Sequence, residues 1–89
     1  MMIQSTRAQW PHTIDDIIKS LDGVWGLVGA TAVNGNLLRL ERSLHEPLQY
    51  VVTEYNGSDE SDVVRKQVFS ADKRQEAIND FAAAIGFIV

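Results

Sequence analysis

The chain has 89 residues, of which 45% are hydrophobic and 22% are charged, and it contains no cysteine. This length and composition are typical of one folded globular domain, which would span residues 1–89. The lack of cysteine excludes disulfide bridges and thiolate zinc sites. No apolar run reaches the roughly 18 residues of a membrane span, and no signal-peptide pattern opens the chain. We therefore expect a cytoplasmic protein without a membrane partner.

The formal net charge is −4 at pH 7, yet half of the eight basic residues lie within ten positions. General binding to nucleic acid requires many Lys and Arg residues that neutralise phosphates, so the overall charge argues against it. A local basic patch is still compatible with this charge. We favour a simpler interpretation, in which these residues protect an edge strand from aggregation. The four residues are Arg65, Lys66, Lys73 and Arg74.

The first clearly predicted element is a helix over residues 14–21. Thr13 is the expected N-cap, and two carboxylates in the first turn would face the positive end of the helix dipole. Gly23 is expected to end the helix in a left-handed conformation. Apolar residues recur at helical spacing and predict one buried stripe, made of Ile14, Ile17, Ile18 and Leu21.

Asn34-Gly35 lies between two apolar runs and is the strongest hairpin signal in the chain. No charged residue occurs from Gly23 to Leu38, so we expect this hairpin to lie in a buried part of a sheet. A two-residue turn would place Thr31 opposite Leu38. Because side chains alternate between the two faces of a strand, this register predicts one shared face for Trp25, Leu27, Leu38 and Leu40.

A second hairpin is predicted from residues 48–55 and 63–69, which are rich in β-branched and aromatic residues. Asn56-Gly57 would begin its turn, and the run 58–62 would extend that turn into an acidic loop. We consider this loop a candidate contact for a basic partner surface or a solvated hairpin tip. Its carboxylates belong to Asp59, Glu60 and Asp62.

The last element is a helix that Ser70 or Asp72 would cap, the latter in a capping box with Gln75. Gly86 is expected to end it. The chain then reads as helix, four strands in two hairpins, and helix, with a possible marginal extra strand at residues 2–6. This order predicts an α+β two-layer sandwich, in which both helices cover one face of an antiparallel sheet. The apolar stripe of the last helix is Ile78, Phe81, Ala82 and Ile85.

The end of the chain also resembles a double-stranded RNA-binding domain. Lys73-Arg74 opens the last helix, and in that family a basic cluster at this position grips phosphates. The likeness covers only the final twenty residues. A fourth strand, an acidic run, a negative net charge and the lack of a glycine pair before the helix depart from the family pattern, so we do not assign the chain to it. The alanines that contribute to the likeness are Ala77, Ala82, Ala83 and Ala84.

Residues with catalytic chemistry are scarce. His12 with Asp15 and Asp16 could face one another at a helix start, but without cysteine they make a weak metal site. His45 is expected in a solvated turn. The glycine spacing fits no phosphate-binding motif, and no serine lies in a nucleophile elbow. We therefore predict no catalytic residue, no cofactor and no metal.

The first strand, residues 24–33, would lie at the edge of a simple four-stranded meander without Lys, Pro or Glu to protect it. Residues 3–6, residues 87–89, a second copy or a partner strand could lie along it, and we favour one of the last two. The residues predicted to form this interaction edge are Trp25, Leu27, Gly29, Thr31 and Val33.

These observations favour a non-enzymatic protein-interaction module of the adaptor or inhibitor type, a class that includes phage-encoded inhibitors and toxin antidotes. The alternatives are a nucleic-acid-binding domain that uses the basic patch and, as the weakest, an enzyme with a minimal site at His12 or His45.

Overall fold

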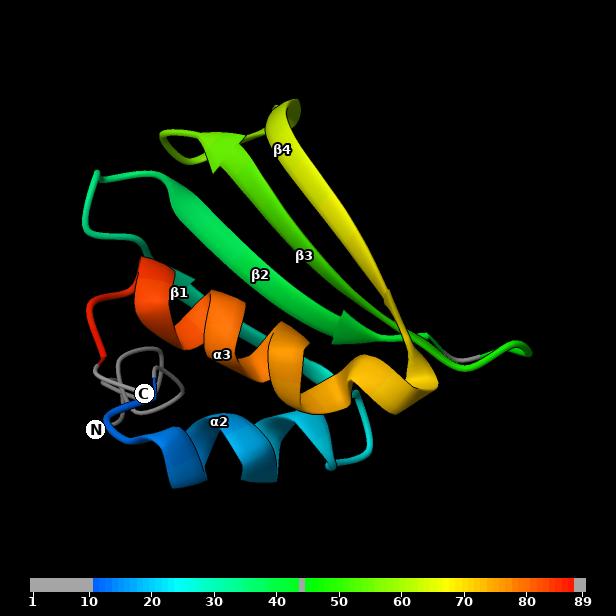
Figure 1. The fold of residues 1–89 in the computed structure, drawn as a ribbon. Helices are drawn as coiled ribbons and strands as arrows, with labels where there is room; N and C mark the ends of the chain where they lie inside the picture. Colours follow the sequence, from blue (N-terminus) through cyan, green and yellow to red (C-terminus); the bar gives the residue numbers. More distant parts are fainter. Residues whose placement is uncertain (1–10, 44, 88–89) are drawn as a thin grey trace.

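The computed structural model describes residues 11–43 and 45–87, which form an antiparallel sheet with helices on one face (Figure 1). The strands follow one another in the order β1-β2-β3-β4. This arrangement confirms the predicted α+β fold and element order, whereas the expected strand at residues 2–6 lies outside the described residues. The elements are α2 (Ile14–Leu21), β1 (Leu27–Thr31), β2 (Leu37–Arg42), β3 (Gln49–Asn56), β4 (Asp59–Ser70), the 3-10 turn η1 (Ala71–Lys73) and α3 (Arg74–Ala84).

Helix α2 begins as its sequence predicts, because the Thr13 side chain accepts a hydrogen bond from the Asp16 N–H at 3.1 Å. The helix also ends at Leu21 as predicted, but Gly23 does not adopt the left-handed conformation that was expected of it. The helix closes on Asp22 in a right-handed conformation, and the left-handed residue is Gly26, with φ of 58°. The turn after the helix is fastened by Arg42 of β2, whose guanidinium donates to the carbonyl oxygens of Leu21 (2.8 Å) and Gly23 (3.1 Å).

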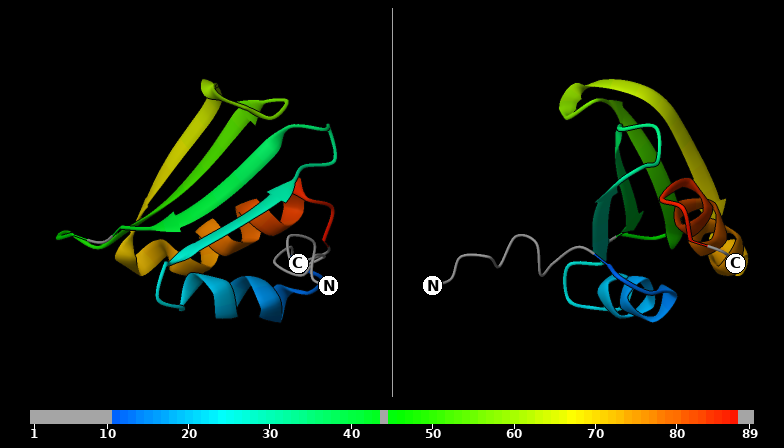
Figure 2. Two further views of the ribbon diagram at one scale, coloured as in Figure 1. Left: turned by 180° about the vertical axis from the view of Figure 1, so that it is seen from behind. Right: turned by 90° about the vertical axis from the view of Figure 1, so that its left-hand side faces the viewer.

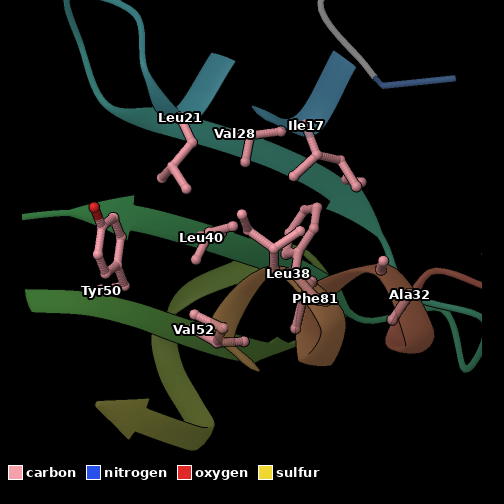
Figure 3. Packing of buried hydrophobic residues seen from close by; sticks show 13 residues of the cluster. Ile17, Leu21, Val28, Ala32, Leu38, Leu40, Tyr50, Val52 and Phe81 are labelled. Atoms are coloured by element: carbon pink, nitrogen blue, oxygen red, sulfur yellow. The ribbon is translucent and has the colours of Figure 1, made fainter. Parts of the chain in front are cut away.

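The core lies between the helices and the sheet (Figure 3). Phe81 and Ile78 of α3 pack over β2 and β3, while Ile17 and Leu21 of α2 are buried on the β1 side. The two helices thus divide the inner face between them, as the views in Figure 2 show. Each of these large side chains contributes roughly 1.5–3 kcal/mol by leaving water, before the entropic cost of ordering the chain.

The first hairpin has a different register from the one predicted. Ala30 lies opposite Leu38, and Val28 lies opposite Leu40, one residue away from the expected pairing. The reason is the turn: Asn34 keeps a negative φ, and Gly35 alone is left-handed, which gives a three-residue loop in place of a two-residue type I′ turn.

This single-residue shift inverts the faces of β1. The side chains that point into the core are Val28 and Ala30, followed by Ala32 just past the strand. Leu27, which was expected to share a face with Leu38, lies on the opposite side and is half exposed, and Trp25 is also outside the core. The predicted shared face is therefore wrong.

The prediction of an acidic loop at residues 58–62 is also wrong. Asn56 pairs with Asp59, so only Gly57 and Ser58 form the turn, and the acidic residues belong to the start of β4. The pairing then shifts at Tyr55, which opens an irregularity in the strand. Strand β4 is exposed on both faces for most of its length, so its polar sequence does not oppose strand formation.

Helix α3 does not use the predicted capping box. Its entry is the turn η1, where the Ser70 hydroxyl donates to the Asp72 carboxylate at 2.6 Å, and no side chain caps the first turn of α3. The predicted stop is confirmed, because Gly86 is left-handed with φ of 93°. Phe87 then turns back and packs against the core, as expected for an apolar terminus, while residues 88–89 lie outside the described residues.

Candidate interaction surface

Strand β1 is an edge of the sheet, and nothing in the described part of the chain pairs with its outer side. Hydrogen bonds at the two ends of the first hairpin join Ala32 to Asn36 and Gly26 to Arg42, so even-numbered residues of β1 bond to β2. Because bonding alternates along an antiparallel strand, Leu27, Gly29 and Thr31 direct their N–H and C=O groups outward. Within the described residues, no hydrogen-bond partner meets these six groups.

Large apolar side chains stand at both ends of this edge. Val24 and Trp25 precede the strand and are 86% and 81% exposed, and Val33 follows it at 76%. Leu27, at the start of the strand, is 43% exposed. Single exposed apolar residues are common, whereas four gathered along one strand edge are the kind of surface that often marks an interaction site.

A groove of about 880 Å³ runs along this edge and is lined by residues of α2 and of the sheet. Its charged lining residues are Asp16 and Lys19 of α2, Arg39 of β2 and Glu60 of β4. Val28 and Ala30 of β1 also line it. The left panel of Figure 2 shows β1 and α2 running antiparallel on this side of the molecule.

The edge is closed at its far end. The N–H of Val33 donates to the carbonyl oxygen of Ala84 at 2.9 Å, so the last turn of α3 meets the chain just beyond β1. The open part therefore runs from Leu27 to Thr31. The sequence indicated five residues for this edge. Leu27, Gly29 and Thr31 form its backbone, Trp25 lies next to it, and Val33 is bonded to α3.

The acidic residues are spread over the start of β4. Glu60 pairs with Arg39, which also contacts Glu41 at 3.2 Å and lies over the ring of Tyr55 at 5.3 Å. Asp59 accepts from Ser61, and Asp62 accepts from Asn56. These carboxylates are tied to their own chain and do not form one acidic projection.

The four basic residues do not form one free patch either. Arg65 pairs with Glu54 of β3 (3.4 Å) and with Asp80 of α3 (3.1 Å). Asp80 lies in the second half of α3, away from the first turn of that helix. At that first turn, Arg74 pairs with Asp22 at 2.6 Å and Lys73 with Glu76 at 3.4 Å. Lys66 is exposed on the opposite face from Arg65. Three of the four charges are thus balanced within the chain.

A polar network that the sequence did not reveal joins the two hairpin turns. Glu54 accepts hydrogen bonds from the side chains of Asn36 (2.7 Å) and Asn34 (3.0 Å), and the side-chain Oδ1 of Asn36 accepts from the Gly57 N–H (2.9 Å). The bond from Asn36, assisted by Asn34 and Arg65, lowers the pKa of Glu54 below its usual value. The repeated Asn-Gly pairs signalled turns but not their contact.

Among the described residues, neither histidine lies in a cluster of potential metal ligands. His12 is exposed, and its backbone N–H donates to the Asp16 carboxylate at 2.9 Å, which completes the start of α2. His45 is exposed in the connection between β2 and β3. Across residues 11–43 and 45–87, no three potential ligands from His, Cys, Asp and Glu lie close enough together to hold a metal ion.

The candidate site is therefore the open edge of β1 with its apolar flanks. None of the helices in the described part of the chain is long and apolar enough to cross a membrane. Comparison of the chain with protein-family models, curated proteins and solved structures finds no match to any of them.

Proposed function

We propose that this chain is a non-enzymatic protein-interaction module whose sheet is completed by a strand from another polypeptide. The observation that carries the proposal is the outward-facing backbone of Leu27, Gly29 and Thr31, which has no partner within the described residues. An added strand gains main-chain hydrogen bonds along such an edge, and flanking apolar side chains supply the buried area.

Two further features support binding at this edge. The strand has no charge or proline, which are the usual means by which proteins discourage strand addition. Trp25 stands beside it at 81% exposure, and tryptophan is among the residues that dominate binding energy at interfaces. The paired basic residues, by contrast, give no comparable support to nucleic-acid binding.

The test is affinity capture from the native host with three full-length baits: wild type, Thr31→Pro and Val68→Pro. Proline at position 31 removes an outward N–H without breaking a bond to β2. Position 68 is the matched control. The N–H of Ser43 donates to the carbonyl oxygen of Gln49, so odd-numbered residues of β3 bond to β2 and even-numbered ones bond to β4. The β4 partners of those even-numbered residues are odd-numbered, so the N–H of Val68 points outward from the sheet.

We expect at least one polypeptide, counting untagged copies of the chain itself, to be captured by wild type and by Val68→Pro. Its recovery should fall at least tenfold with Thr31→Pro, while circular dichroism shows that all three baits are folded. Equal recovery with Thr31→Pro, or no capture above empty beads, would reject the edge as the binding surface.

A further inference from the structure

We propose that the polypeptide that completes the edge is a second copy of this chain, paired antiparallel through β1 about a two-fold axis at Gly29. This inference rests on the proposed function and names its partner. The result is one continuous sheet of two molecules, with all helices on the same face. Such a contact is isologous: where one residue of the first copy contacts a different residue of the second, the reciprocal contact also forms.

The register follows from the direction of the free backbone groups. Antiparallel strands exchange two hydrogen bonds at each bonded pair, so Gly29 opposite Gly29 of the second copy places Leu27 opposite Thr31 on either side. This register pairs all three outward residues. A shift of the axis by one position would leave at least one of them without a counterpart in the strand.

The flanking apolar residues are complementary in the same register. Trp25 lies two residues before the strand and Val33 two residues after it, so antiparallel pairing brings Trp25 of one copy towards Val33 of the other, twice. A buried tryptophan contributes roughly 150–250 Å² of contact area. The two tryptophans would thus supply a substantial share of the roughly 1,200–2,000 Å² that a stable interface buries.

Charge also favours a second copy over an unrelated partner. Like charges directly opposite each other destabilise strand pairs, and no charged residue occurs from Gly23 to Leu38, so a copy meets no such repulsion within the strand. The residues that line the groove carry both signs, Asp16 with Lys19 and Arg39 with Glu60. An acidic or basic partner would find no single-sign surface there to recognise.

Gly29 offers a decisive test because it would lie on the axis. A Cβ at Gly29 would lie 3.8 Å from the carbonyl oxygen of Leu38, which is ordinary contact, so a side chain fits without disturbing β2. Gly29→Lys places two lysines opposite each other, and Gly29→Glu places two glutamates. Each variant alone should repel its copy, whereas an equimolar mixture restores an attractive pair.

The measurement is sedimentation equilibrium of the full chain over a hundredfold concentration range. We expect wild type to approach twice its 9.9 kDa mass, and each Gly29 variant to dissociate with a Kd at least tenfold higher. The mixture should return to the doubled mass. Val68→Lys, on the opposite edge, is the control and should associate like wild type. Thr31→Pro repeats the test through the backbone if a charged variant loses its circular dichroism signal.

A strictly monomeric wild type would overturn the proposal, as would Gly29 variants that dimerise unaided or a mixture that does not associate. Association only after deletion of residues 1–6 would also overturn it, because the chain's own beginning would then cover the edge. A monomer that still captures a different protein through Thr31 would reject the second copy alone and leave the interaction module standing.

Discussion

The two edges of the sheet are built in opposite ways. Strand β1 has five residues, carries no charge and buries Val28 and Ala30 against the helices, while its outward backbone groups meet no partner among the described residues. Strand β4 has twelve residues, is exposed on both faces, and carries charged side chains and an irregular pairing near Tyr55. The buried strand thus has the unprotected edge, and the exposed strand has the protected one.

This contrast shows that burial of a strand's face and protection of its edge are separate properties. Charges and irregular pairing discourage strand addition at β4, where few apolar contacts hold the strand to the core. At β1 the inner face is held by the packing of Val28 and Ala30, and the outward backbone groups have no partner within the described residues. A preorganised edge loses little entropy on binding, which suits a recognition surface.

A matched pair of substitutions should break the contrast most strongly. Val28→Asp places a carboxylate at a position that is 3% exposed, whereas Val68→Asp places one at a position that is 48% exposed. We expect Val28→Asp to lower the free energy of unfolding by about 3–5 kcal/mol, as an unpaired buried charge does. Val68→Asp should change it by less than about 1 kcal/mol. Urea denaturation followed by circular dichroism measures both, and equal effects would mean that β4 is buried to the same degree as β1.

The sequence predicted which elements exist, and it missed how the first hairpin is aligned. The helices were predictable because their isoleucine and phenylalanine residues recur at a spacing of three and four, which places them on one face only if the segment is helical. The register of β1 was not, because Leu27 and Val28 are both apolar and either could point inward. The choice was made by the turn, where Gly35 alone adopts positive φ.

The candidate site was predictable in part for the same reason. An uncharged strand next to a single neighbour indicated a sheet edge, and the outward backbone groups of Leu27, Gly29 and Thr31 meet no partner within the described residues. Whether they form an interaction site stays a prediction. The acidic run was assigned to a loop because its polar residues lack the alternation of a half-buried strand. Pairing with β3 forms that strand instead, and the contact of the two Asn-Gly turns through Glu54 depends on spacing between hairpins that no local pattern encodes.

Glu54 links the first hairpin to β4, and its removal should have an intermediate effect. Its carboxylate accepts bonds from Asn36, Asn34 and Arg65, and the side chain is 13% exposed. We expect Glu54→Gln to destabilise the fold by about 1.5–3 kcal/mol near neutral pH, the usual value for bonds to a charged group. The exposed Glu46→Gln is the control and should lie within about 0.5 kcal/mol of wild type.

The pH dependence of this difference follows from the lowered pKa of Glu54, whose first cause is the bond from Asn36. A carboxyl with a lower pKa in the folded state stabilises it fully above the unfolded pKa of roughly 4.3 and loses that contribution as pH falls through the folded value. The gap between wild type and Glu54→Gln should therefore narrow below about pH 4. A gap that stays constant down to pH 2 would show that the charge of Glu54 is not what stabilises the turns.

The smallest effect expected concerns the glycines that make β1 thin. Gly29 has ordinary strand geometry and room for a Cβ, so Gly29→Ala should stabilise the fold by about 0.5–1 kcal/mol, mainly by restricting the unfolded chain. Gly26 is the contrast: its φ is 58°, and a Cβ there would lie 3.1 Å from the Arg42 guanidinium carbon. Gly26→Ala should thus destabilise the fold, by about 1 kcal/mol or more. Thermal unfolding at low protein concentration, where association contributes little, measures both signs. A loss of stability in Gly29→Ala would mean that the backbone in the middle of β1 requires glycine. The room for a Cβ at Gly29 would then not show that this position tolerates a side chain.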